Sequence, residues 1–440
     1  MSTRRQFIKT AAAGTAASLL TSLPALSYGR IIGANERLRF AVAGVNGRGK
    51  SLIGAIQSVP NAEVAYICDV DSRAMAKAQQ MVEDATGQRP QGIKDYRELM
   101  EKKDFEVVAI ATPEHWHAPM ALMGMQAGKH VYVEKPCAHN PAEAEMLVAS
   151  QAKHGLLMQM GNQQRSGAVS IQAMQDIQDG IIGEVFFGKA WYSNRRKSIG
   201  NGTTAAVPDW LDWDLWQGPA PRKEFLNNVV HYNWHWFRHW GTGEIHNNGT
   251  HEIDVCRWAL GVKFPTQVIA TGQRLFFEDD WQFADTQFIT YQYPNGKMIT
   301  WEGKSCSPQN YHQRGRGATI HGEKGWILLD RNIYRVYGND NKLIKELKEA
   351  QQSATTDTLG RGSLDDRHMS NLAKGIREGE ALRAPIDDAY VSTMLCHLGQ
   401  IAMDHGGSLL INQQNGHILG NAQAQMAWGR QYELGWEPSV

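Results

Sequence analysis

The spacing of hydrophobic residues follows two patterns, which change near residue 160. Before this point, short apolar runs rich in β-branched residues alternate with segments whose apolar side chains recur three and four positions apart. The first pattern is typical of buried strands and the second of helices packed on one face. Alternating strands and helices predict a doubly wound parallel sheet over residues 36–160. The expected strands are 38–44, 63–69, 105–112 and 130–135, and the expected helices are 50–59 and 118–128.

Beyond residue 160 the chain reads mainly as strands. Pro294, Asn295 and Gly296 predict a hairpin turn within one of them. The polar stretch 340–363 predicts an exposed connection, and two helices close the chain. We therefore expect a second α/β domain over 161–440, with a large, open, mostly antiparallel or mixed sheet and C-terminal helices that pack back on the first domain. The expected strands are 184–193, 266–275, 285–305 and 318–330, and the expected helices are 366–379 and 389–406.

The N-terminus resembles a twin-arginine export signal. Arg4 and Arg5 precede Phe7 and Lys9, and the apolar run that follows is too short and too broken to span a bilayer. The alternative is a basic amphipathic N-terminus. The signal predicts that residues 1–30 are a signal peptide and that the protein is periplasmic or otherwise exported, with no membrane span.

Composition narrows the partners. The chain has 440 residues, 42% hydrophobic residues and a formal net charge of zero, which favours neither nucleic acid nor an anionic membrane as a partner. The five cysteines are scattered without C-x-x-C spacing, so neither a zinc knuckle nor a disulfide framework is indicated.

The turn after the first expected strand carries the clearest cofactor signal. The sequence GVNGRG matches G-x-G-x-x-G at Gly44 and Gly49, and Asn46 takes the middle position. Asp69 ends the next strand, where a carboxylate accepts both ribose hydroxyls and repels a 2′-phosphate. Together these features predict a Rossmann domain that binds NAD rather than NADP. Arg73 nearby is the opposing feature, and a Gly-rich turn without a ligand is the alternative.

From about residue 36 onward the chain resembles the glucose–fructose oxidoreductase and inositol dehydrogenase (Gfo/Idh/MocA) family. The resemblance rests on the motifs GVNGRG, ICDVD, ATPEHWH, EKP, GNQQRS and GTHEID. It implies a Rossmann domain with a bound nicotinamide, a C-terminal α/β domain whose open sheet often joins subunits into a homo-oligomer, and oxidation of sugars, cyclitols or related polyols.

The resemblance also assigns roles to particular residues. Lys135 matches the lysine of the EKP motif, and a buried ammonium stabilises the alkoxide that develops when an alcohol is oxidised. His251 matches the family histidine, a candidate general base. Asn247 stands where many members carry an aspartate, so the usual acidic partner of the histidine is absent. The implied cofactor contacts are Gly44, Asn46, Gly47, Arg48, Gly49, Asp69, Thr112, Pro113, His117, Glu134, Lys135 and Asn162.

Six tryptophans fall within residues 210–240, and aromatic rings of this kind pack on the C–H faces of sugars. About half of them are expected to be core or interface residues only. The predicted substrate contacts are Trp234, His235, Trp236, Asp254 and Arg165.

A metal site is the alternative interpretation of the histidines. HEIDV lacks the second histidine of H-E-x-x-H, so the favoured interpretation includes no metal. The alternative ligand set is His231, His235 and His246, because several nitrogen and oxygen donors crowd together there. His231, His235 and His239 would share a face only if their segment were helical.

Export constrains the chemistry, because no free NAD pool is expected outside the cytoplasm. The cofactor is therefore expected to stay tightly bound and to be restored in each cycle, with a separate electron acceptor as one route.

The favoured function is an NAD-dependent oxidoreductase acting on a sugar, glycoside or polyol, with oxidation at C3 of a glycoside as the concrete case. One alternative is an NAD-dependent glycoside hydrolase or epimerase working through a transient 3-keto sugar. In the related α-N-acetylgalactosaminidase branch the EKP lysine is replaced, so Lys135 favours the oxidoreductase. Another is a sugar-binding protein that bears a cofactor without turnover.

Overall fold

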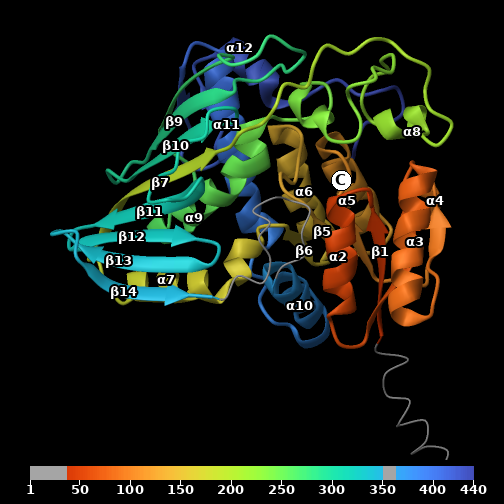
Figure 1. Ribbon diagram of the computed structural model, residues 1–440, viewed down its shortest axis with the longest axis horizontal. Helices are drawn as coiled ribbons and strands as arrows, with labels where there is room; N and C mark the ends of the chain where they lie inside the picture. The colour runs from red at the N-terminus through yellow and green to blue at the C-terminus, as the bar shows by residue number, and fades with distance from the viewer. Residues whose placement is uncertain (1–36, 350–362) are drawn as a thin grey trace, which may run out of the picture.

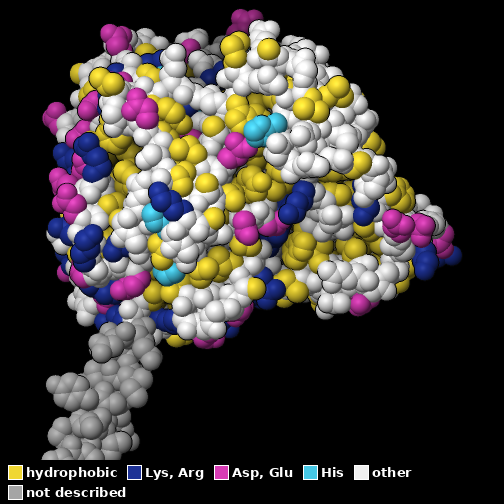
Figure 2. Space-filling model, turned by 180° about the vertical axis from the view of Figure 1, so that it is seen from behind, with side chains coloured by type: hydrophobic (Ala, Val, Ile, Leu, Met, Phe, Trp, Pro, Cys, Tyr) yellow, Lys and Arg dark blue, Asp and Glu magenta, His cyan; other side chains and the backbone are white. Residues whose placement is uncertain are grey.

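The computed structural model describes residues 37–349 and 363–440. The predicted export signal, and residues 350–362 of the predicted connection, lie outside this range. Within the described residues, none of the helices combines the length and the apolar character needed to cross a bilayer. On the face shown in Figure 2, acidic and basic side chains are interspersed, so this face presents no broad field of one sign.

The N-terminal domain is the predicted doubly wound parallel sheet. Its six strands run in the order β3-β2-β1-β4-β5-β6. The order reverses between β1 and β4, and in such sheets ligands bind in the crevice at the carboxyl ends of the strands beside the reversal. The strands are β1 Leu38–Ala43, β2 Ala62–Cys68, β3 Gln91–Ile93, β4 Val107–Ile110, β5 His130–Val133 and β6 Met158–Met160, and the helices are α2 Arg48–Gln57, α3 Ser72–Thr86, α4 Tyr96–Met100, α5 His117–Gln126 and α6 Pro141–His154.

The C-terminal domain is built on a mixed sheet of ten strands in the order β14-β13-β12-β11-β7-β10-β9-β8-β15-β16. Only the pairing of β7 with β10 is parallel among its described ladders. Both the fold class and the predicted hairpin at Gly296 are confirmed. The strands are β7 Val185–Ser193, β8 Gln267–Gln273, β9 Thr286–Gln292, β10 Met298–Lys304, β11 Arg316–Gly322, β12 Gly325–Asp330, β13 Ile333–Gly338, β14 Leu343–Lys348, β15 Ser408–Ile411 and β16 Ile418–Leu419.

Two expectations about strands were wrong. The single strand expected over 318–330 is the hairpin of β11 and β12, which turns at Glu323 and Lys324. The polar stretch expected to be a connection contains β14, which pairs with β13 at the edge of the sheet. An edge strand with charged side chains resists pairing with further strands, and its polarity makes it look like a loop in the sequence.

Helices cover one face of the large sheet and leave the other open (Figure 1). Cys256 and Leu260 of α9 and Leu395 of α11 belong to the core formed against the strands. Met369 and Leu372 of α10 instead join the apolar core of the Rossmann domain beside α2. The remaining helices are α7 Ala168–Gln178, α8 Trp213–Gln217, α9 Thr250–Leu260, α10 Ser363–Glu378, α11 Ile386–Asp404 and α12 Ala422–Gln425.

A long segment between β7 and α9, residues 194–240, crosses from the large sheet to the Rossmann domain; we call it the strap. It arches over the top of the molecule in Figure 1 and carries α8. Its backbone docks on the loop after β2, where Ser72 N donates to Trp210 O at 3.0 Å and Asp212 N donates to Val70 O at 3.1 Å. The strap therefore roofs the crevice at the carboxyl ends of the parallel strands.

Candidate active site

A cavity of about 380 Å³ lies in this crevice, between the Rossmann domain and the strap. Its volume is within the range of small-molecule sites. Its walls come from the turn after β1, the ends of β4 and β5, the strap and the segment before α9. The predicted site residues that line it are Gly44, Asn46, Gly47, Arg48, Asp69, Thr112, Pro113, His117, Glu134, Lys135, Trp234, His235 and Asn247.

The glycine turn fits a dinucleotide. Gly44 has φ of 80°, and a Cβ there would lie 2.6 Å from Thr112 N. A Cβ at Gly49 would lie 2.1 Å from the carbonyl oxygen of Gly44, so Gly49 packs α2 against the turn instead of lining the cavity. Gly47 caps α2 without a side-chain hydrogen bond, which leaves N–H groups for a diphosphate.

Asp69 is held with its carboxylate at the cavity wall. One oxygen accepts from Val45 N at 2.7 Å and the other from Asp71 N at 2.9 Å. Burial raises the pKa of Asp69 to about 6, against the effect of these hydrogen bonds. A preoriented acceptor at the end of β2 suits the ribose hydroxyls of NAD and opposes a 2′-phosphate.

Replacing Asp69 by Asn is expected to weaken NADH binding about tenfold to a hundredfold and to reduce the preference over NADPH, because charge-assisted hydrogen bonds are lost. Titration with both reduced cofactors, followed by their fluorescence, measures the two affinities. The matched control is Asp95→Asn, a carboxylate on the same cavity wall that is paired with Arg97. An unchanged ratio of the two affinities in Asp69→Asn would contradict the role of Asp69.

Glu134 and Arg48 form a buried frame beside the cavity. Arg48 Nε donates to Glu134 Oε1 at 2.9 Å, and its Nη1 donates to Asp365 of α10 at 2.9 Å. Gln163 Nε2 donates to the same Glu134 oxygen at 2.9 Å. This frame fixes the backbone that presents Lys135, and it ties α10 to the cofactor turn.

Lys135 and Asn247 meet in the cavity. Lys135 Nζ donates to the backbone oxygen of Asn247 at 2.5 Å and to its Oδ1 at 3.3 Å. Burial lowers the pKa of Lys135, while the charges of Glu134 and Glu114 raise it. An ammonium has three N–H donors, so one remains for a bound oxygen. The Asn247 side chain also hydrogen-bonds Tyr232, another residue of the cavity wall.

His251 does not line the cavity, although Asn247 four positions earlier does. Asn247 lies in a π-helical turn, Ile245–Gly249, and His251 lies in the first turn of α9 that follows it. Burial lowers the pKa of His251 well below its usual range, and the charges of Arg331 and Lys135 lower it further.

Glu114 is a cavity residue that the sequence interpretation missed, although it stands in ATPEHWH just after β4. Its side chain is 2% exposed and accepts a hydrogen bond from Thr242 Oγ1. Burial raises the pKa of Glu114 to about 7, against the opposing charge of Lys135. A carboxylic acid that titrates near neutral pH lies beside the lysine.

Replacing Glu114 by Gln is expected to flatten the pH dependence of the free energy of unfolding. The folded-state pKa of Glu114 is about 7, above the usual 4.5, so the folded protein binds more protons between these values and loses stability as pH rises through them. We expect the free energy of unfolding, measured in urea, to differ between Glu114→Gln and wild type. This difference should grow by up to about 3 kcal/mol as the pH rises from 5 to 8. Thr242→Val, which removes a bond to the carboxylate, should move the transition to higher pH. A constant difference would be evidence against this.

The tryptophans of the strap divide into cavity and core. Trp234 and Trp216 line the cavity. Trp213 stacks on Trp216 with ring centroids 4.7 Å apart and contacts Trp240 edge-on. Trp236, a predicted substrate contact, stacks on Trp281 at 3.7 Å outside the cavity. It therefore packs the base of the strap.

Arg165 and Asp254, also predicted as substrate contacts, bind each other. Arg165 donates from Nε and Nη2 to both oxygens of Asp254 at 2.8 Å, and its Nη1 donates to Asp388 at 2.7 Å. Neither residue lines the cavity. With these groups occupied, the structure assigns the pair to joining α9 and α11. Asn162, a predicted cofactor contact, is buried and likewise does not line the cavity.

The alternative metal site is not formed. His231 Nε2 lies 2.9 Å from Asp71 Oδ2, His235 bonds the strap backbone, and His246 Nε2 lies 2.9 Å from His397 Nδ1. The segment around His235 is a short 3₁₀ turn, Asn233–Trp236, so the expected shared helical face is absent. Across residues 37–349 and 363–440, no three His, Cys, Asp or Glu side chains gather as ligands of one ion.

Sequence models of one family match both parts of the chain. The description "Oxidoreductase family, NAD-binding Rossmann fold" matches residues 38–162. The description "Oxidoreductase family, C-terminal alpha/beta domain" matches residues 211–409.

Three individual proteins that this chain resembles are less than 30% identical to it over the matched residues. A glycosyl hydrolase family 109 protein of Saccharopolyspora erythraea is 29% identical over 215 residues, which cover 48% of this chain and 41% of that protein. The match thus spans less than half the length of this curated relative. Levoglucosan dehydrogenase, solved with NADH and levoglucosan, superposes with a TM-score of 0.67 at 19% identity, covering 86% of this chain and 100% of that one. Aldose-aldose oxidoreductase from Caulobacter crescentus, solved with glycerol, gives 0.65 at 16% identity, covering 85% and 100%. At these identities the two structures show the shared fold.

Proposed function

Because the chain belongs to the Gfo/Idh/MocA family of NAD-binding oxidoreductases, as its motifs predicted, we propose that it oxidises a hydroxyl group of a sugar, glycoside or related polyol. The observation that carries the proposal is the Lys135 ammonium, which Asn247 holds in the same cavity as the glycine turn and Asp69. The third N–H of Lys135 is a donor for a substrate oxygen.

The residues of this chain divide the work. The glycine turn and Asp69 would hold NAD, which supplies the hydride acceptor when bound. Lys135 binds the oxygen of the reacting carbon and stabilises the negative charge that develops on it. Trp234 and Trp216 offer ring faces for the C–H groups of a sugar. The strap excludes bulk water, which strengthens these electrostatic contacts.

Oxidation at C3 of a glycoside is the concrete reaction we propose. The N–H donor of Lys135 and the aromatic walls formed by Trp216 and Trp234 suit a pyranoside, and levoglucosan dehydrogenase shares the fold. A redox-neutral hydrolysis or epimerisation through a 3-keto sugar is the second candidate, and the match to a glycosyl hydrolase family 109 protein favours it. Lys135 favours oxidation at C3, because the EKP lysine is replaced in the related α-N-acetylgalactosaminidase branch.

The test is the absorbance of the purified full chain near 340 nm with methyl glucosides, p-nitrophenyl glycosides and myo-inositol. A rise at 340 nm that persists supports the oxidoreductase. Release of p-nitrophenol without net reduction supports the glycosidase. Binding of a sugar with neither change would indicate a sugar-binding protein without turnover and would overturn the proposal.

We further propose that the cofactor stays bound and that the protein works outside the cytoplasm, as Arg4 and Arg5 suggest. The strap supports retention, because it is docked on the loop after β2 by backbone bonds and by Arg73, whose guanidinium lies 3.4 Å from the ring centre of Trp210. An NAD content near one per chain after gel filtration, in protein recovered from the periplasm, is the expected result. Loss of NAD on dilution would contradict retention.

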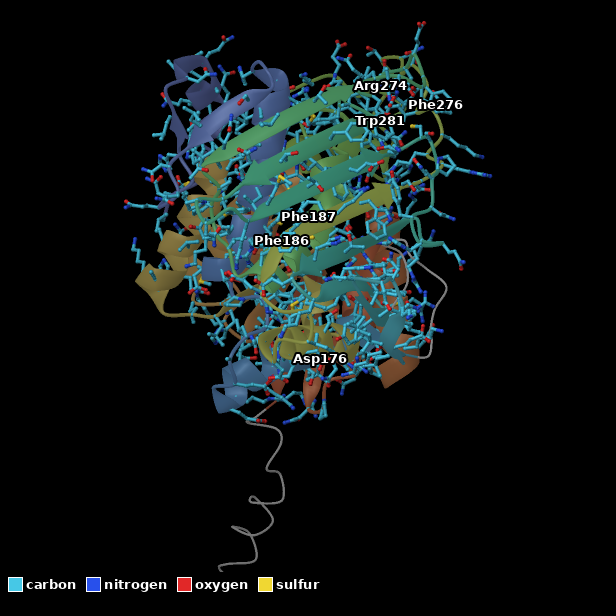
Figure 3. The ribbon with its side chains drawn as sticks, turned by 90° about the vertical axis from the view of Figure 1, so that its left-hand side faces the viewer. Asp176, Phe186, Phe187, Arg274, Phe276 and Trp281 are labelled. Atoms are coloured by element: carbon cyan, nitrogen blue, oxygen red, sulfur yellow. The ribbon has the colours of Figure 1, made fainter. Side chains whose placement is uncertain are left out.

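We also propose that the open face of the large sheet joins copies of this chain. Figure 3 shows this face, with Phe187 on it. Phe187, His321, Trp326 and Tyr337 form an aromatic row across four strands, with successive ring centroids 5.3, 6.1 and 4.2 Å apart. Phe288 on the same sheet is 45% exposed. An exposed apolar sheet face is typical of a protein interface, and light scattering tests it.

A further inference from the structure

Oxidation of a hydroxyl group needs an acceptor for the hydroxyl proton, and the histidine expected to serve, His251, is not among the residues that line the cavity. Most proton acceptors on the cavity wall are engaged. Both oxygens of Asp69 accept backbone N–H groups, and Glu134 is bound to Arg48. Both nitrogens of His117 face carbonyl oxygens, at 2.6 and 2.8 Å. His231 faces Asp71.

His235 differs from these groups, because its hydrogen bond fixes its tautomer. Its Nδ1 lies 2.6 Å from the backbone oxygen of Tyr232. A carbonyl oxygen only accepts, so Nδ1 must carry the proton, and Nε2 of the neutral ring carries the lone pair. Burial and the charge of Lys135 hold the pKa of His235 well below its usual range, which keeps the ring neutral.

The lone pair of His235 is available to a ligand. The side chain lines the cavity, no described residue hydrogen-bonds Nε2, and the atom is not sealed from solvent. The ring is also held in place. It stacks on Trp234 with centroids 3.6 Å apart and an angle of 17°, and the Tyr232 ring lies on it at 4.6 Å. A fixed, neutral acceptor therefore shares the cavity with Lys135.

We propose that His235 is the general base that removes the hydroxyl proton of the substrate. This inference rests on the proposed function. The O–H bond breaks and its proton forms a bond to Nε2 of His235. The C–H electron pair would leave as hydride to NAD, which the glycine turn and Asp69 would hold, and the carbon–oxygen bond would become a carbonyl. Lys135 remains an ammonium and stabilises the oxygen throughout.

The test combines a tautomer measurement with a variant. In ¹⁵N-histidine-labelled protein, the two-bond ¹⁵N–¹H spectrum should contain the signal of a ring with a protonated Nδ1 and a bare Nε2 that vanishes in His235→Asn. Asn keeps a donor near the position of Nδ1 and removes Nε2. A protonated Nε2 at His235 overturns the proposal without any substrate.

With a sugar that reduces the wild-type cofactor, His235→Asn should slow single-turnover reduction about 10²- to 10⁴-fold while NAD content stays unchanged, and added imidazole should restore part of the rate. The matched control is His239→Gln in the same strap, whose ring nitrogen lies 2.6 Å from Pro221 O and does not line the cavity. A wild-type rate in His235→Asn, or a larger loss in His251→Asn or Glu114→Gln, overturns the assignment. A wild type that no sugar reduces overturns the proposed function instead.

Discussion

Replacing Lys135 by Met is expected to lower the rate of sugar oxidation about a thousandfold while NAD remains bound. Met has a similar length and is apolar, so it fills the buried space but removes the ammonium that Asn247 holds in the cavity. Loss of one such donor typically costs 10²- to 10³-fold, and loss of the positive charge adds to it. Single-turnover reduction at 340 nm measures the effect.

The control for this experiment is Lys135→Arg, which keeps the charge but not the compact ammonium geometry. It is expected to retain more activity than Lys135→Met and less than the wild type. Removal of the lysine charge should also raise the pKa of Glu114 further, because that charge now opposes the effect of burial. If Lys135→Met oxidises the sugar at the wild-type rate, the alkoxide is stabilised by another group and the role of Lys135 is wrong.

The sequence predicted the Rossmann domain closely, because its signals are local. Buried parallel strands appear as continuous apolar runs, and the turn at Gly44 is fixed by a backbone conformation that glycine adopts readily. Lys135 could be found from the EKP motif, which is also local and begins just after β5, at the carboxyl edge of the sheet where ligands bind.

The rest of the site depends on contacts between distant parts of the chain. No local signal in the sequence predicts that the strap contacts the loop after β2, because Trp210 and Ser72 are 138 positions apart. Asn247 lines the cavity and His251 does not, although their spacing suggests one helical face. Glu114 is a functional candidate only because burial beside Lys135 changes its titration.

The bond between Arg165 and Asp254 is the clearest case of a motif whose role depends on the fold. Asp254→Asn is expected to lower the free energy of unfolding by about 3 kcal/mol, because it removes the buried carboxylate that accepts two hydrogen bonds from Arg165 and leaves only Asp388 as its charged partner. The side chains are only 8% and 2% exposed, and Ser392 also donates to Asp254. The change in urea midpoint at constant m measures the loss.

The matched control is Asp404→Asn, which breaks the Arg238 pair, where the side chains are 45% and 32% exposed. Water already solvates that pair, so its loss should cost less than about 1 kcal/mol. The charges of Arg165 and Arg257 lower the pKa of Asp254 against the effect of burial, so its stabilisation is present above the usual carboxyl range and is lost as pH falls below it. The difference in the free energy of unfolding between Asp254→Asn and wild type should therefore become smaller in acid. Unchanged stability together with lost sugar binding would instead return Asp254 to the substrate site, because only a ligand contact would then explain its effect.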